Sequence, residues 1–264
     1  MKRTAVFLLF TCLAGGAAAQ NKTIFEKPKT ERESVAAHKA LIIPFEPKLY
    51  FGEVDYNINA ETKLSSKEIK YKFRDGLNEQ LYKAFKTGGY NCVDMMEDTA
   101  KYKKDLAGIY QYLRYDYQKV PNQENYQPPK TEKEQKAIEK GQLNVETNSD
   151  LRFMNARIAN PKTLQQLNAK YKTDVFVFIN QLDIRASGSK DPTQLGEGST
   201  KRKIVVHYTV FNLAGKEINS GIAEEEFDPM LNNPKKITDK HFPKVAALIL
   251  QRVNKALSVP QAQK

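Results

Sequence analysis

The segment from Asp174 to Ile184, which reads DVFVFINQLDI, constrains the fold of this chain more than any other segment. Its first half is an almost continuous run of large apolar side chains. Such a run is typical of a strand in the middle of a sheet, buried on both faces. A second short apolar run, Ala40 to Phe45 (ALIIPF), is closed by a proline and also predicts a buried strand.

The clearest helix is predicted over Ser65 to Phe85. Apolar side chains recur every four residues from Ile69 onward, which gives one apolar stripe. Ser65 and Glu68 have the spacing of a capping box, and Gly88–Gly89 follows as a helix terminator. Three further helices are predicted over Glu97 to about Tyr117, Pro161 to Tyr171 and about Asp239 to Leu257.

Further strands are predicted over Tyr90 to Met95 and over Lys203–Phe211 and Glu217–Phe227, which flank a turn that contains Gly215. Residues 47–64 have no clear period and are predicted to form a long loop. The order β-α-β-α-(insertion)-α-β-β-β-α predicts an α/β fold, in which helices pack on a mixed sheet.

The first 19 residues have the three parts of a secretory signal peptide. Lys2 and Arg3 are basic, Ala5 to Leu13 is apolar, and Ala17 to Ala19 is a small-residue cleavage site. We therefore expect cleavage after Ala19 and a periplasmic location. The apolar run is shorter than the ~20 residues that span a bilayer, so no transmembrane helix is expected. Bulky residues before Cys12 argue against a lipid anchor.

The remaining chain is predicted to form one domain. Residues 20–37 and 258–264 are expected to be tails, and residues 38–257 a single α/β domain. Residues 121–150 form a polar insertion with too few apolar side chains to fold by itself. Because Cys12 leaves with the signal peptide, Cys92 cannot form an intramolecular disulfide and is expected to be inert.

No residue pattern in the sequence indicates catalysis. His38, His207 and His241 lack further ligands at metal-binding spacing, and neither a nucleophile elbow nor a phosphate-binding loop is present. Glu224 to Glu226 are adjacent in a strand, so their carboxylates alternate between faces and cannot converge as a glycosidase requires. We expect no catalytic residue, no metal and no cofactor, and we interpret His207 as a surface-facing or hydrogen-bonded structural histidine.

Aromatic side chains supply the candidate contact residues. Tyr50, Phe51 and Tyr56 lie in the predicted loop over residues 47–64. In the segment YQYLRYDY, Tyr110 and Tyr117 share the apolar face of the predicted helix and are expected in the core. Tyr112 and Tyr115 lie elsewhere on that helix and are expected to form a contact patch.

The pattern of elements resembles a group of bacterial envelope domains. ALIIPF, a long helix, the segment LNAKYKTDVFVFINQLDI, the hairpin VVHYTVFNLAGKEINSG and a final amphipathic helix follow in order. This is similar to the N-terminal domain of TolB, the periplasmic domain of the curli secretion lipoprotein and the lipoprotein activators of penicillin-binding proteins. The resemblance covers about residues 38–117 and 160–257, and the chain also resembles uncharacterised exported proteins of Bacteroidetes.

The resemblance implies a non-enzymatic module that docks onto other envelope proteins, which is the function we expect. The formal charge of +11 supports an alternative, a binding protein for an acidic polymer or glycan. Lysines spread beside acidic residues also fit a plain solvated surface, and export argues against nucleic acid as a partner. A hydrolase whose site is assembled from distant residues is a further alternative.

Overall fold

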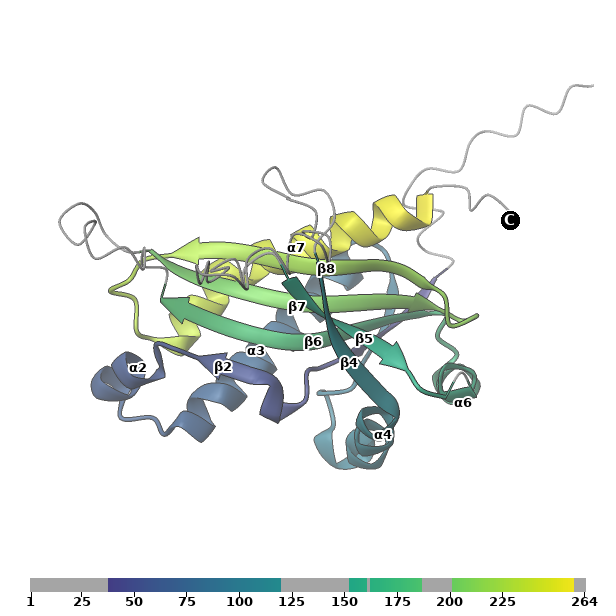
Figure 1. Ribbon diagram of the computed structural model, residues 1–264, viewed down its shortest axis with the longest axis horizontal. Coiled ribbons are helices and arrows are strands. Elements are labelled where there is room, and N and C mark those ends of the chain that lie inside the picture. Colours follow the sequence, from purple (N-terminus) through teal and green to yellow (C-terminus); the bar gives the residue numbers. More distant parts are fainter. Residues whose placement is uncertain (1–37, 120–151, 161, 187–200, 259–264) are drawn as a thin grey trace, which may run out of the picture.

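The computed structural model describes residues 38–119, 152–160, 162–186 and 201–258. The predicted signal peptide, the predicted tail over residues 20–37 and the predicted polar insertion lie outside these residues, as does the predicted C-terminal tail apart from Ser258, which ends the last helix. The described residues form a mixed six-stranded sheet with helices packed on it, which confirms the predicted α/β fold (Figure 1). The strands of this sheet are β1 (Lys39–Ile43), β2 (Tyr50–Gly52), β3 (Asn91–Asp94), β6 (Val175–Ala186), β7 (Arg202–Asn212) and β8 (Glu217–Phe227).

The strand order is β3-β1-β6-β7-β8, and β2 also pairs with β6, beyond the end of β1. The strands β1 and β2 run parallel to β6, whereas β7 and β8 are antiparallel to their neighbours. The central position of β6 confirms the interpretation of DVFVFINQLDI, because β6 is flanked by strands along its whole length.

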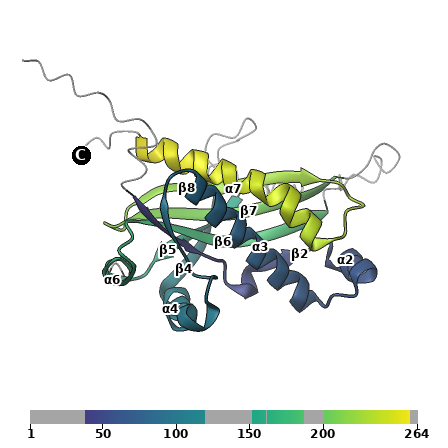
Figure 2. The same ribbon diagram turned by 180° about the vertical axis from the view of Figure 1, so that it is seen from behind.

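Two helices cover the first face of the sheet, as Figure 2 shows. Helix α3 (Ser66–Thr87) buries its predicted stripe, including Ile69, Phe73 and Leu77, in one large core together with helix α7 (Pro234–Ser258). The predicted capping box is confirmed, since Ser65 N–H donates to the Glu68 carboxylate at 2.8 Å and Glu68 N–H donates to the Ser65 hydroxyl. Burial of each such large side chain contributes about 1.5–3 kcal/mol to the free energy of folding.

The second face is covered in two ways. Helices α4 (Thr99–Tyr112) and α6 (Lys162–Tyr171) pack on the half near β1, around Leu41, Phe176 and Phe178. An antiparallel pair, β4 (Leu113–Lys119) and β5 (Arg152–Ile158), crosses the sheet next to them (Figure 1). We call this pair the β4–β5 hairpin; β5 contacts β6, β7 and β8.

The prediction of a long loop over residues 47–64 was wrong. This segment contains a 3-10 helix (Pro47–Leu49), strand β2 and helix α2 (Asp55–Thr62). Strand β2 is only three residues long, and α2 buries a single residue, Ile58, so neither element produces a period in the sequence. A Cβ atom on Gly52 would overlap with the Asp55 carboxylate and the Tyr50 hydroxyl, so a larger residue at the end of β2 would require these side chains to shift.

The helix predicted to extend to about Tyr117 ends at Tyr112, and the next seven residues form β4. The interpretation of Tyr110 as a core residue is confirmed, because it packs against the second core. The same interpretation of Tyr117 was wrong: its side chain is 51% exposed. In a strand Tyr115 and Tyr117 share one face. Tyr115 packs against the second core, whereas Tyr117 reaches the sheet only with its hydroxyl, which donates to Gln181.

A β-bulge in β6 shapes the second face. Ile179 and Gln181 lie opposite Tyr208 and His207, which leaves Asn180 as an extra residue. Because Ile179 and Leu182 both point into the first core, Asn180 and Gln181 both point to the second face. The bulge therefore places two consecutive polar side chains on the face where the β4–β5 hairpin lies.

None of the helices in the described ranges combines the length and the apolar composition that a membrane span requires.

Candidate functional site

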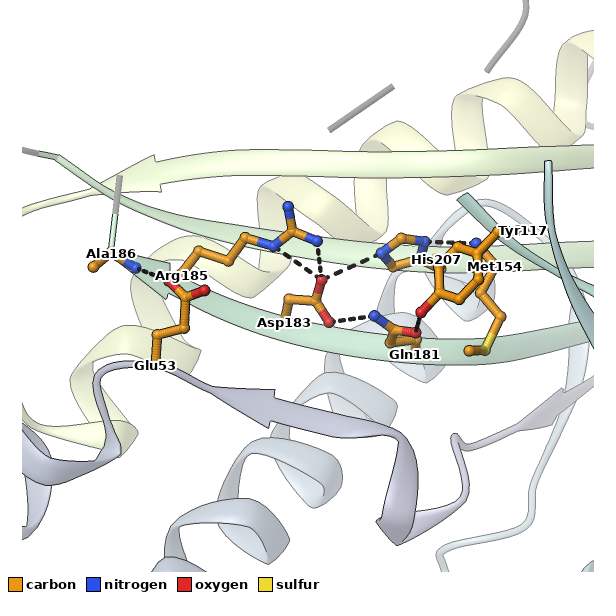
Figure 3. A network of polar contacts seen from close by, with 8 residues as sticks. All are labelled: Glu53, Tyr117, Met154, Gln181, Asp183, Arg185, Ala186 and His207. Atoms are coloured by element: carbon orange, nitrogen blue, oxygen red, sulfur yellow. Dashed lines mark hydrogen bonds and ion pairs between the residues drawn. The ribbon is translucent and has the colours of Figure 1, made fainter. Parts of the chain in front are cut away.

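A buried carboxylate lies at the centre of the second face. Asp183 on β6 is 2% exposed, and its oxygens accept hydrogen bonds from Gln181 Nε2 at 2.6 Å and Arg185 Nε at 3.0 Å (Figure 3). Burial acts to raise the pKa of Asp183, but His207, Gln181 and Arg185 together hold this pKa below its usual value. The carboxylate is therefore ionised at neutral pH.

His207 on β7 lies beside this carboxylate and is 1% exposed. Its Nε2 atom is 3.5 Å from Asp183 Oδ2, and its Nδ1 atom is 2.9 Å from the backbone N of Met154 on β5 (Figure 3). Because Nδ1 accepts the Met154 N–H, the ring proton belongs on Nε2, which faces Asp183. At 3.5 Å this second contact is electrostatic and too long for a good hydrogen bond.

A histidine paired with an aspartate is a common general base in enzymes. In such a pair the nitrogen that faces away from the carboxylate takes a proton from the nucleophile. Here that nitrogen is Nδ1, and it is occupied by the Met154 N–H. The pair therefore attaches β5 to the sheet. Of the two sequence interpretations of His207, the hydrogen-bonded one is confirmed and the surface-facing one was wrong, because the side chain is buried.

Two further side chains of the sheet hold the backbone of β5. Thr209 Oγ1 accepts the N–H of Ala156 at 3.0 Å, and Asn180 Nδ2 donates to the carbonyl oxygen of Met154 at 2.8 Å. Asn180 also donates to Thr209 Oγ1 at 2.7 Å. Polar side chains thus satisfy backbone groups of β5 that a neighbouring strand would otherwise pair.

Apolar contacts support the same attachment. Phe153 of β5 is buried with Val205 of β7 and Ile222 of β8 in a small separate cluster. Leu113 of β4 and Ala156 of β5 are also buried, in the second core. Apolar packing and polar side-chain contacts therefore fix the hairpin on the sheet together.

Two exposed aromatic rings flank the buried network. Tyr117 on β4 donates its hydroxyl to Gln181 Oε1 at 2.8 Å and leaves half of its side chain in solvent (Figure 3). Phe51 on β2 is the register partner of Asp183 and is 50% exposed. We call the surface formed by Phe51 and Tyr117 the aromatic face.

The candidate contact residues from the sequence are dispersed in the structure. Tyr50 lies on the opposite side of β2 from Phe51, where it stacks on Phe73 and donates to Asp55 at 2.5 Å. Tyr56 on α2 is 82% exposed, and Tyr112 at the end of α4 is 42% exposed. Their roles as contact residues stay predictions.

Tyr115 packs partly against the second core, and burial raises the pKa of its hydroxyl. Tyr117, which lies two residues further along β4, is the exposed residue that sequence reasoning missed. The alternation of Leu113, Tyr115 and Tyr117 with polar residues is the signal that could have indicated a strand there.

The acidic run on β8 is divided between the two faces, as predicted. Glu225 faces α7, where its carboxylate contacts Lys244 and lies 3.1 Å from His241 Nδ1. Glu224 is the register partner of Val205 and therefore lies on the second face. Its carboxylate is 3.7 Å from the Lys203 ammonium group. Burial opposes ionisation of Glu225, but Lys244 and His241 outweigh it and lower the pKa of this carboxyl.

Within the described residues, no three His, Cys, Asp or Glu side chains lie close enough to hold a metal ion. A shallow groove of about 410 Å³ runs between α3 and α7 and is lined mainly by apolar side chains, with Lys83 at its border. Burial raises the pKa of the Cys92 thiol on β3 to about 12.

The chain matches no protein-family model, no curated protein and no solved structure. The resemblance to TolB-like envelope domains is therefore an expectation drawn from the order of elements alone.

Proposed function

We propose that the chain is an exported, non-enzymatic envelope protein that acts as a protein–protein interaction or assembly factor and docks through the aromatic face. The observation that carries the proposal is the pair of half-exposed rings, Phe51 and Tyr117, on one face of the sheet. Aromatic side chains are enriched at the centres of protein interfaces, where they contribute much of the binding energy.

The support beneath these rings favours binding. Tyr117 is held by Gln181, which in turn donates to Asp183, and Phe51 is held by the pairing of β2 with the central strand. Because the positions of these rings are already fixed before binding, they lose less conformational freedom when a partner binds. More of the contact energy then appears as affinity. The nearby charges of Arg185 and Lys203 would form a polar border.

The buried network itself is consistent with a structural role. The nitrogen of His207 that could act as a base is hydrogen-bonded to Met154, and the Asp183 carboxylate is enclosed by three side chains. The predicted signal peptide supports action outside the cytoplasm. The partner that fits these features is another envelope protein with a complementary apolar patch.

Alanine variants test this proposal in intact cells that carry a tagged chain. After chemical crosslinking, the wild-type chain is expected to recover the same envelope proteins reproducibly. The double variant Phe51→Ala/Tyr117→Ala is expected to lose them, whereas Tyr56→Ala and Tyr112→Ala, which alter exposed rings elsewhere, are expected to retain them. Equal recovery by the double variant and the wild type would contradict docking through the aromatic face.

A second candidate, binding of an acidic polymer or glycan, is supported by the formal charge of +11. Several surface lysines are already paired, including Lys83 with Glu79 and Lys235 with Asp239. Retention on an immobilised anionic polymer should fall steeply with salt if the charge binds this ligand. If the chain is not retained even at low salt, its positive charge does not bind an anionic polymer and only makes the surface well solvated.

A further inference from the structure

We propose that His207 is a proton-operated latch, which holds the β4–β5 hairpin on the sheet at neutral pH and releases it on acidification. The inference rests on the contact between Nδ1 of His207 and the N–H of Met154. It concerns the conformation of the hairpin and does not depend on the proposed docking function.

Among the three side chains that hold the backbone of β5, which are His207, Thr209 and Asn180, only His207 can change charge near neutral pH. Thr209 and Asn180 do not titrate, whereas histidine is the side chain whose charge changes most readily in the physiological pH range. Protonation converts Nδ1 from an acceptor into a donor, which would then face the donor N–H of Met154. The contact with β5 and the protonated ring therefore exclude each other.

The charged groups around His207 determine whether the protonated ring is stable in its place on the sheet. From β6, Asp183 lies 3.5 Å from Nε2, and Arg185 shares that carboxylate. Asp183 supplies a counter-ion for the imidazolium, and Arg185 weakens this effect.

The other elements contribute less charge. From β8, Glu224 lies on the same face, two residues beyond Ile222, the register partner of His207, and contacts Lys203. From β4, Tyr117 presents only a neutral hydroxyl, which is bonded to Gln181. From β5, Phe153 and Met154 carry no charge. The protonated ring can therefore remain beside Asp183 after β5 has left.

Release would also change the aromatic face. The two strands of the hairpin are paired with each other from Leu113 to Lys119, so they would move together. Tyr117 would then lose its bond to Gln181. If the proposed function is correct, acidification would therefore weaken docking, although the latch itself can be tested without any partner.

Amide hydrogen exchange in the purified chain measures the latch directly. Corrected for the intrinsic effect of pH, the opening equilibrium reported by the Met154 and Ala156 amides should increase on acidification, by up to about tenfold per pH unit, which is the limit for coupling to one proton. The amide of Ile69, which is bonded to Ser65 O in α3, is the internal reference and should not respond in this way. Met154 protection that is constant from about pH 7.5 to pH 5 would overturn the latch.

The variant His207→Asn provides the matched control, because its Oδ1 can replace Nδ1 as an acceptor but cannot titrate. Met154 protection in this variant should be independent of pH. If the variant retains the wild-type pH response, the response belongs to another titratable group, and the latch is wrong.

A measurement on the wild-type ring keeps the proposal testable should His207→Asn fail to fold. The ¹⁵N shifts of His207 should indicate a neutral ring with the proton on Nε2 at about pH 7.5, and a doubly protonated ring at the pH where Met154 loses protection. A ring that stays neutral while Met154 loses protection would also overturn the proposal.

Discussion

The hydroxyl of Tyr117 donates to Oε1 of Gln181 at 2.8 Å, and this bond links an exposed ring to the buried network of the second face. Gln181 reaches that face because the bulge at Asn180 shifts the alternation of β6. The bond should therefore stabilise the hairpin as well as orient the ring.

Tyr117→Phe removes this bond and keeps the ring. We expect the free energy of unfolding to fall by about 0.5–1.5 kcal/mol, the usual contribution of one hydrogen bond. Urea denaturation monitored by circular dichroism measures the change. The matched variant Tyr112→Phe, at an exposed position at the end of α4, should alter stability by less than about 0.5 kcal/mol. Equal effects of the two variants would contradict the role of the Tyr117 hydroxyl.

Thr209→Val should destabilise the fold by about 1–3 kcal/mol, because it leaves the buried Ala156 N–H without its acceptor. Thr173 offers a precise comparison: its hydroxyl is equally buried and has no hydrogen-bond partner. Thr173→Val should be neutral or stabilising. Thermal unfolding of both variants measures the difference, and a reversed order would show that Thr209 does not hold β5.

Asp183 should contribute to stability against acid. Its pKa in the folded chain lies below the unfolded value of about 3.9. The contribution is therefore fully present above that pH and is lost as the pH falls through the folded-state pKa. Asp183→Asn should lower the free energy of unfolding at neutral pH and lose less of it on acidification. Urea titrations at several pH values measure both effects, and parallel pH profiles for the two chains would contradict this role.

Cys92 should react slowly in the folded chain. Burial raises the pKa of its thiol to about 12 from 9.0, which reduces the thiolate population roughly a thousandfold at neutral pH. Alkylation by iodoacetamide, followed by mass spectrometry, should be slow in buffer and fast in denaturant. Rapid alkylation of the folded chain would show that the thiol is accessible and reactive.

The sequence predicted the elements whose side-chain patterns are long and regular. The apolar first half of DVFVFINQLDI identified the central strand, and the repeat from Ile69 to Phe85 identified the long helix with its capping box. In both cases, burial of one stripe or of a whole strand determines the structure and also leaves a visible period.

The candidate site could be predicted only in part, because it depends on long-range pairing. The strand β4 is paired with β5, which follows after more than thirty residues, so YQYLRYDY was interpreted as a continuous helix. The bulge at Asn180 leaves no signal in the sequence. His207 and Thr209 alternate with apolar residues, but the sequence does not show that the backbone of β5 satisfies their polar atoms.

The most direct test of the central claim is photo-crosslinking from single positions in living cells. A photoreactive phenylalanine analogue in place of Phe51 or Tyr117 should capture the same envelope protein from both positions. The same analogue in place of Tyr56 or Tyr112 should capture it weakly or not at all. Strong capture from Tyr56 and Tyr112, with none from Phe51 and Tyr117, would contradict the assignment of the aromatic face as the docking surface.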